Sequence, residues 1–230
     1  MVEIDWFKFE DKDYDFPFYD KNPYVPKWGW IILFFVFLVG SVLTISEKLS
    51  AAILCCIVFI VPVLYFLNWD YKAIFRKPSG RDILLAVALF VGYMIFAVIM
   101  STILEQVGIV GGGLVEESSI NIMTIFTAIF SLMGEEFIKF IPFIFFLRVI
   151  YKYTSNRKLA VIISVALVMV MFASLHVLNP VMFLFALCIQ GFGSIFEFIG
   201  YIKTKNVLIS YITHLCTDVF IYLIIIMGIG

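Results

Sequence analysis

Seven long apolar stretches set what this chain can fold into, because each is long enough for a helix to cross a lipid bilayer. A crossing takes about 20 consecutive apolar residues in helical form. Hydrophobic residues make up 63% of the 230, and only 14% are charged, whereas soluble domains average about 25% charged residues. The sequence therefore predicts an integral membrane protein of the all-α class, a polytopic transmembrane helix bundle of about seven helices. The predicted spans are Trp28–Ile45, Ser50–Leu67, Ile83–Leu104, Ile120–Leu147, Leu159–Leu178, Val181–Ile199 and Val207–Ile229.

The fourth stretch is longer than one crossing requires, and it contains Pro142. Proline removes one backbone hydrogen bond from a helix. The stretch therefore predicts either a tilted helix or a helix divided at Pro142. Re-entrant passage of one or more stretches is a further alternative.

Basic residues alternate between the connecting loops and give the bundle a predicted orientation. By the positive-inside rule, we expect the basic loops and the N-terminus in the cytoplasm and the C-terminus outside. Residues 1–27 then form a polar cytoplasmic segment, and residues 28–230 form a single transmembrane domain. The net charge of −1 gives no basis for a nucleic-acid partner. The basic loop residues are Lys72, Arg76, Lys77 and Arg81, then Arg148, Lys152, Arg157 and Lys158, then Lys203 and Lys205.

A small set of titratable residues lies inside the apolar stretches. An intramembrane charge costs on the order of 2.5–3.5 kcal/mol on insertion scales, so such residues are functional by default if they can meet one another. A membrane histidine can also serve only as a hydrogen-bonding group between helices, and that alternative stays open. The set is Glu135, Glu136, Lys139, His176, Glu197, His214 and Asp218.

Helical spacing allows several of these side chains to meet. His214 and Asp218 are four residues apart and share a helix face, so Asp218 can orient the imidazole or pair with it. Glu135 and Lys139 have the same spacing, and Lys139 can neutralise one of the two adjacent glutamates.

Two further residues receive different predictions. Phe172 lies one turn from His176 and gives that imidazole an aromatic neighbour. Glu197 lies near the cytoplasmic end of its predicted span, where it could reach the interface, and we interpret it as structural.

A polar group of this kind inside a bundle contains what peptide hydrolysis requires. A carboxylate takes a proton from water, a histidine shares or relays it, and cationic or hydrogen-bonding groups meet the developing oxyanion. None of the common motifs of soluble hydrolases or nucleotide-binding proteins is present.

Three motifs, in order and in residue type, resemble those of the CPBP superfamily of intramembrane proteases. That superfamily includes the type II CAAX prenyl endopeptidases, the bacterial Abi proteins linked to bacteriocin self-immunity, and the PrsW-type site-1 proteases. The resemblance covers about residues 120–220, which would be the protease-like core. The motifs are Glu135-Glu136-x-x-Lys139, Phe172-x-x-x-His176 and His214-x-x-x-Asp218.

The resemblance implies an intramembrane endopeptidase in a membrane that we expect to be a prokaryotic cell membrane. It implies that Glu135 is the base that activates water, with His176 assisting. It also implies that His214 and Asp218 stabilise the oxyanion or, in an older interpretation of the family, help to hold a metal. Glu136 and Lys139 would support Glu135. Its substrate would be a membrane protein or a lipidated peptide, handled in contact with membrane lipid.

Two departures separate the chain from the CAAX-protease branch. That branch has arginine where this chain has Phe140, and Lys139 instead follows the PrsW-like form of the motif. The eukaryotic CAAX branch has asparagine at the position of Asp218. Both departures weaken a prediction that prenylated CAAX proteins are the substrate.

Metal dependence and function keep alternatives open. We favour a site without a cofactor, because Lys139 places a positive charge where a divalent cation would be repelled. The alternative is a zinc site made by His176, His214 and Glu135 with an open water position. The alternatives to a protease are a non-proteolytic scaffold or bacteriocin-immunity protein on the same fold, and proton-coupled transport.

The depths of the two histidines do not match when they are counted along straight helices. At about 1.5 Å per residue, His176 lies roughly 26 Å from the cytoplasmic start of its helix and His214 only about 10 Å from the start of its own. Tilted helices, a later start of the fifth helix, or a deeply dipping turn at residues 203–206 would each reconcile them.

Overall fold

The computed structural model describes residues 25–109, 120–177 and 182–228, and every regular element in these ranges is a helix, which confirms the all-α prediction. Residues 1–24, most of the predicted N-terminal segment, lie outside the described ranges. The helices are α1 (Lys27–Thr44), α2 (Leu49–Phe66), the 3-10 turn η1 (Tyr71–Ala73), α3 (Gly80–Gln106), α4 (Ile122–Thr154), α5 (Arg157–Leu175), α6 (Phe183–Ala186), the π turn η4 (Leu187–Gly191), α7 (Ile195–Thr204) and α8 (Val207–Ile226).

Six helical segments of the described chain are long and apolar enough to cross a membrane, and they match six of the predicted spans. The remaining predicted span, the fourth along the chain, is α4, which is long enough but carries charges at its middle. The chain is therefore built as a membrane-spanning helix bundle. The six are α1, α2, α3, α5, α8 and the continuous segment from Phe183 to Thr204.

Helix α4 is undivided at Pro142 and runs for 33 residues, so the alternative of a helix divided at Pro142 is wrong. Neighbouring helices can supply the packing that makes a proline tolerable inside a membrane helix. Helix α4 packs against α1, α2, α5 and α8, and residues 136–141 are all buried. It is the central helix of the bundle, and it positions the first motif.

The predicted span Val181–Ile199 is built differently from a single α-helix. The short helix α6 passes into the π turn η4, and α7 begins after Ser194. Gly191 allows this turn to approach α5, because a Cβ there would come 3.0 Å from the carbonyl oxygen of Met169. Such π turns insert one residue into a helix and often lie at functional sites.

The turn between α7 and α8 is buried. Lys205 and Asn206 in this turn are both buried, and Asn206 caps α8 by accepting a hydrogen bond from the backbone N–H of Leu208. Hydrogen bonds from the α2–α3 linker to this turn account for part of the burial.

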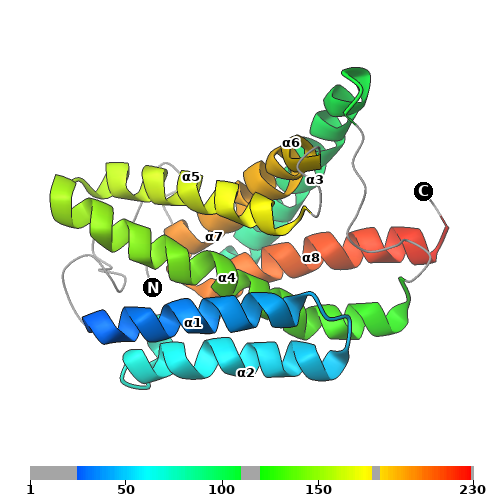
Figure 1. The fold of residues 1–230 in the computed structure, drawn as a ribbon. Coiled ribbons are helices and arrows are strands. Elements are labelled where there is room, and N and C mark those ends of the chain that lie inside the picture. Colours follow the sequence, from blue (N-terminus) through cyan, green and yellow to red (C-terminus); the bar gives the residue numbers. More distant parts are fainter. Residues whose placement is uncertain (1–24, 110–119, 178–181, 229–230) are drawn as a thin grey trace.

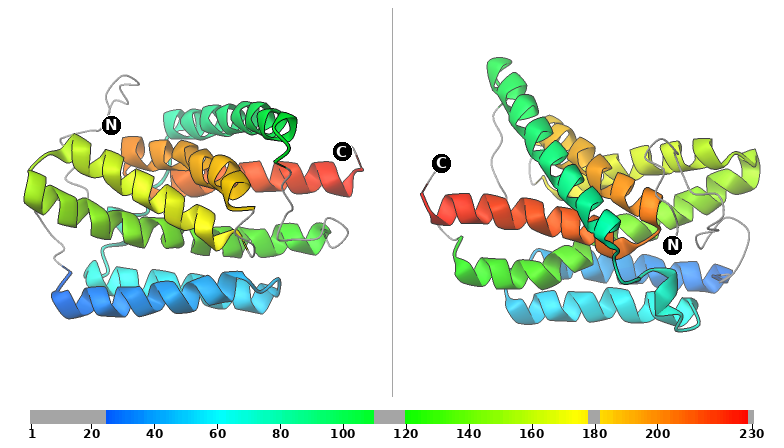
Figure 2. Two further views of the ribbon diagram at one scale, coloured as in Figure 1. Left: turned by 45° about the horizontal axis from the view of Figure 1, so that its top comes forward. Right: turned by 180° about the vertical axis from the view of Figure 1, so that it is seen from behind.

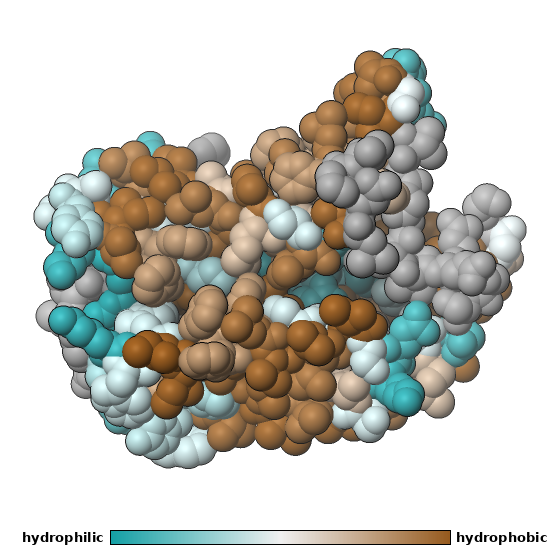
Figure 3. Space-filling view, viewed as in Figure 1, coloured by the Kyte–Doolittle hydropathy of each residue, from teal (hydrophilic) through white to brown (hydrophobic). Residues whose placement is uncertain are grey.

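Figure 1 shows how the helices are arranged around the site. Helices α1, α2, α4 and α8 run side by side, α5 lies along the other side of α4, and α3 leans away from the rest (Figures 1 and 2). The ends that carry the basic loops gather on the left of Figure 1, and we term this the basic end. Figure 3 shows a hydrophobic band between hydrophilic ends, the distribution expected of a membrane-spanning surface.

Candidate active site

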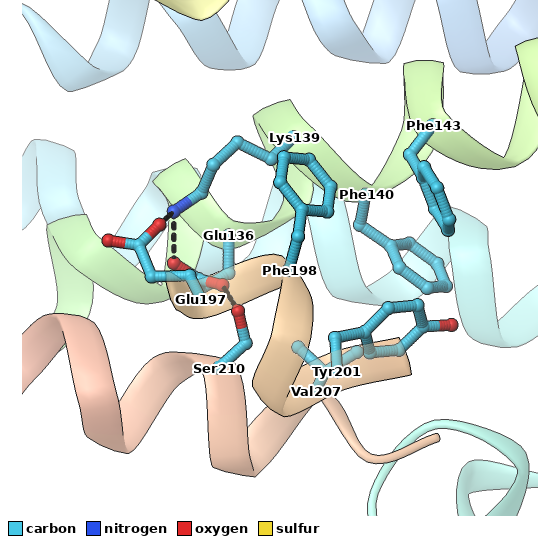
Figure 4. A pocket seen from close by; sticks show the side chains of 9 residues that line it. All are labelled: Glu136, Lys139, Phe140, Phe143, Glu197, Phe198, Tyr201, Val207 and Ser210. Atoms are coloured by element: carbon cyan, nitrogen blue, oxygen red, sulfur yellow. Dashed lines mark hydrogen bonds and ion pairs between the residues drawn. The ribbon is translucent and has the colours of Figure 1, made fainter. Parts of the chain in front are cut away.

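A buried ionic network joins α4 to α7 and α8 (Figure 4). Glu136 and Lys139 lie three residues apart on α4, and the Lys139 Nζ donates to Glu136 Oε1 at 2.5 Å. The same ammonium donates to Glu197 of α7, and the hydroxyl of Ser210 on α8 donates to Glu136. All four side chains are buried, so each charge has a partner where none could be hydrated.

The imidazole of His214 divides the site into two halves. Its Nδ1 lies 2.8 Å from Glu136 Oε1, and a carboxylate can only accept when it is ionised. We therefore assign a proton to Nδ1, which anchors the ring against the network. The Nε2 atom points the other way. We term Glu136, Lys139, Glu197 and Ser210 the inner half of the site.

The outer half consists of two carboxylates that face Nε2 of His214. Glu135 Oε2 lies 4.0 Å from Nε2, and Asp218 Oδ1 lies 3.9 Å from it. The side chains of Glu135 and Asp218 are 21% and 25% exposed, whereas that of His214 is 9% exposed. These separations are too long for direct hydrogen bonds, and they suit a single bridging water molecule.

The inner half is almost closed. The cavity beside it has a volume of about 10 Å³, roughly the space that one water molecule needs. Figure 4 shows the side chains that line it. They are Glu136, Lys139, Phe140, Phe143, Glu197, Phe198, Tyr201, Val207 and Ser210.

The second motif reaches the network through an aromatic ring. The Phe172 ring centroid lies 5.0 Å from Nζ of Lys139, close enough for a cation–π contact. His176 caps the C-terminus of α5, where its Nδ1 donates to the Phe172 carbonyl at 2.8 Å and its ring lies 4.4 Å from the Phe172 ring. Within the described chain, no carboxylate oxygen lies within 4.0 Å of His176. The structure thus brings together Glu135, Glu136, Lys139, His214 and Asp218. The Phe172 ring lies between this group and His176.

The interpretation of Glu197 as a residue that reaches the interface is wrong. Its side chain is buried and paired with Lys139, with its Oε1 3.9 Å from Nδ1 of His214. The sequence held a signal for this pairing, because an intramembrane carboxylate needs a cation and Lys139 is the one cation inside the predicted spans. Ser210 carried no comparable signal, since an isolated serine in an apolar helix is common.

The donor atoms of three side chains lie close enough to hold a metal ion. In the described ranges, one such set has its atoms within 4.8 Å of one another: Glu136, Glu197 and His214. This group differs from the residues of the zinc alternative, which were His176, His214 and Glu135. The Lys139 ammonium contacts both carboxylates and lies 3.4 Å from Nδ1 of His214. The Lys139 ammonium therefore lies among the three donor groups, where a divalent cation would meet its charge.

Comparison with protein-family models, with curated proteins and with solved structures gives no match for this chain. The functional argument therefore depends on the three motifs and on the geometry that joins them.

Proposed function

We propose that the protein is an intramembrane endopeptidase that hydrolyses a peptide bond with water activated by Glu135. One observation carries this proposal: Nε2 of an anchored imidazole faces two partly exposed carboxylates at 4.0 and 3.9 Å. A base, a hydrogen-bond donor and space for water then meet at one point inside a hydrophobic bundle, as a hydrolytic site requires.

The reaction follows from the position of each group. His214 acts as an imidazolium in this step, with protons on both Nδ1 and Nε2. Glu135 takes a proton from a water molecule held between its Oε2 and the Nε2–H of this ring. The water oxygen bonds to the carbonyl carbon, and the carbonyl π electrons move to the oxygen. Nε2–H of His214 donates a hydrogen bond to this oxyanion, and the carboxyl of Asp218 donates a second one when it carries a proton. When the C–N bond breaks, the carbonyl re-forms and Glu135 passes its proton to the leaving amine.

The inner half acts as the support for His214. Glu136 accepts from Nδ1, and Lys139, Glu197 and Ser210 hold the Glu136 carboxylate and its neighbours in place. A ring fixed in this way keeps Nε2 aimed at the outer half without reorganisation during the reaction. Glu136 and Lys139 are positioning residues in this account. His176 supports the site through Phe172, one ring from Lys139.

The basic loops support a topology with the N-terminus in the cytoplasm and the C-terminus outside. The prokaryotic cell membrane of this proposal follows from the resemblance of the three motifs alone. The substrate in this account is a membrane protein or a lipidated peptide, because the site lies between membrane-spanning helices. Reporter fusions at Met1 and Gly230 test the orientation. A reporter that is active outside when fused at Met1 would contradict it.

The alternative is a non-proteolytic scaffold or immunity protein. One observation favours it: the inner half is fully satisfied by its own members and needs no substrate to explain it. The outer half separates the two functions, because a scaffold has no need of two partly exposed carboxylates beside an imidazole.

Peptidomics of membranes tests the proposal. We would compare cells that carry the wild type, the Glu135→Gln variant and the matched control Glu105→Gln, which changes an exposed acid at the end of α3. We expect peptides that accumulate with the wild type and with Glu105→Gln but are absent with Glu135→Gln. Identical peptide sets from wild type and Glu135→Gln would sink the protease proposal and favour the scaffold.

A further inference from the structure

The accessibility of the site changes in one direction along two helices. On α4, Lys139 and Glu136 are buried, and Glu135, which is farther from the basic end, is 21% exposed. On α8, Ser210 is buried, and Asp218, two turns farther from the basic end, is 25% exposed. Both helices therefore place the closed half toward the basic end and the open half away from it.

A clamp closes the basic end. The linker between α2 and α3 packs on the α7–α8 turn, where the N–H of Val207 donates to the carbonyl of Ile74 at 2.9 Å. Asn206 exchanges two hydrogen bonds with the backbone of Arg76, at 3.2 and 2.8 Å. The Arg76 guanidinium donates to the carbonyls of Thr204 and Lys205, at 3.1 and 2.5 Å.

Burial at the clamp is complete enough to exclude a peptide. Ile74 is 0% exposed and Val207 is 1% exposed. The cavity between this clamp and the inner half has room for about one water molecule. Among the residues that the structure describes, an extended peptide that approached from the basic end would therefore meet the packed clamp.

The described residues cover the opposite side of the site less completely. Helix α5 ends at Leu175, well short of the far ends of α4 and α8 in Figure 1. Figure 3 shows a hollow in this region, between α5 and α6 on one side and α4 and α8 on the other, with hydrophilic surface inside it. Tyr222 is four residues beyond Asp218 on α8, and its phenol is near enough to interact electrostatically with Asp218 and Glu135.

We infer that substrate reaches the site from the end opposite the basic loops, so that the protein cuts a bond on the non-cytoplasmic side of the membrane. This rests on the proposed function and on its orientation. The substrate class is a membrane-anchored protein or lipidated peptide whose non-cytoplasmic segment enters the hollow in extended form. A peptide in the cytoplasm would have to displace the Arg76–Asn206 clamp.

Thiol labelling in intact cells tests the access route without requiring activity. Tyr222→Cys places a thiol one helical turn beyond Asp218 on α8, and Asp218→Cys gives a second position, at the site itself, if the first variant does not fold. Lys48→Cys and Lys72→Cys, both at exposed positions, report the two ends of the bundle. All signals are compared with wild type, which has four native cysteines.

A charged, membrane-impermeant thiol reagent added outside should label Tyr222→Cys and Lys48→Cys. It should label Lys72→Cys only after the membrane is permeabilised. Labelling of Tyr222→Cys and Asp218→Cys only from the cytoplasmic side, or from neither side, would overturn the inferred route. External labelling of Lys72→Cys in intact cells would overturn the orientation on which the route depends.

The positions of the cleavage sites complete the test. Peptides lost in Glu135→Gln cells should come from cuts in non-cytoplasmic segments of membrane proteins. Cuts confined to cytoplasmic segments would support the protease and overturn the inferred side of access. An unchanged peptide set together with external labelling of Tyr222→Cys would overturn the cleavage claim while retaining the open hollow, which separates the failure of the function from the failure of the route.

Discussion

The two halves of the site use the same kinds of residue in opposite ways. In the inner half, Glu136 and Glu197 are buried and bonded directly to Lys139. In the outer half, Glu135 and Asp218 are partly exposed, and their carboxylate oxygens lie 4.0 and 3.9 Å from Nε2 of His214. Glu135 and Glu136 are adjacent in sequence, yet their side chains fall on opposite sides of His214.

This difference assigns a separate role to each half: the inner half holds His214 in place, and the outer half carries out the reaction. Glu136 already accepts hydrogen bonds from an ammonium, an imidazole and a hydroxyl, which occupy most of the acceptor positions of its carboxylate. It therefore has little capacity left to take a proton from water. A carboxylate with room for a bridging water keeps that capacity, and this is Glu135. The inner half should therefore control stability, and the outer half should control the reaction.

The largest expected effect comes from removing the shared cation. Lys139→Met leaves two buried carboxylates without the ammonium that they share, and breaking a buried ion pair in this way costs about 3–5 kcal/mol. We expect a large fall in folded protein, measured by thermal unfolding in detergent. The control Lys152→Met changes an exposed lysine of the same helix and should stay within about 0.5 kcal/mol of wild type.

Removing the carboxylates as well sharpens this result. Replacing a whole buried ionic group by neutral side chains of similar volume is often neutral or stabilising. Lys139→Met combined with Glu136→Gln and Glu197→Gln should therefore recover most of the lost stability. A triple variant as unstable as Lys139→Met would show that the loss came from packing rather than from unpaired charge.

A smaller effect is expected from the clamp. Asn206→Ala removes the cap of α8 and two hydrogen bonds to Arg76, so it should cost about 1–3 kcal/mol and lower the rate of cleavage by letting α8 shift. The control Asn156→Ala removes the cap of α5, whose side chain accepts from Leu159 N–H at 3.0 Å, far from the site. It should cost about 0.5–2 kcal/mol and leave cleavage unchanged. Equal losses of cleavage in both variants would contradict a positioning role for the clamp.

Asp218→Asn should have a modest effect on the reaction. An amide keeps a hydrogen-bond donor for the oxyanion, so we expect a cleavage rate within about tenfold of wild type and an unchanged melting temperature. A base at this position would behave differently, since its loss costs roughly 10²–10⁴-fold. Loss on that scale in Asp218→Asn would assign the proton transfer to Asp218 instead of Glu135.

Removal of metal ions should have the smallest effect of all. Because Lys139 occupies the position between Glu136, Glu197 and His214, cleavage should survive strong chelation. Elemental analysis of protein purified without added metal provides the second measurement. Stoichiometric zinc, with activity lost on chelation and restored by zinc, would contradict the assignment.

Much of the fold could be predicted because the bilayer imposes a length on each helix. The apolar stretches gave six spans and the central helix, and i,i+4 spacing paired His214 with Asp218. Helix ends were less predictable, because caps decide them: α3 begins at Gly80 rather than Ile83, since Ser79 and Asp82 form a capping box. The interrupted α6–α7 segment was missed because a π turn leaves no mark on apolar composition.

The site was predictable within helices and less so between them. Spacing along one helix predicted that Lys139 could neutralise one of the two adjacent glutamates, and the structure pairs it with Glu136. Spacing did not predict the second pairing, with Glu197 of another helix. Glu197 and Ser210 come from other helices, and their places depend on how α7 and α8 pack against α4. The buried turn at Asn206 contributes to that packing through a hydrogen bond with Arg76, which is 130 residues away in sequence. No local sequence pattern encodes such a contact.

The most direct test of the two-half account compares neighbouring glutamates. Glu135→Gln and Glu136→Gln would be measured side by side for melting temperature and for cleavage of a substrate identified by peptidomics. We predict that Glu135→Gln melts like wild type and loses cleavage by about 10²–10⁴-fold, whereas Glu136→Gln melts at a clearly lower temperature because a buried charge partner is lost. Wild-type cleavage by Glu135→Gln, or destabilisation of both variants to the same extent, would contradict the division of the site into a holding half and a reacting half.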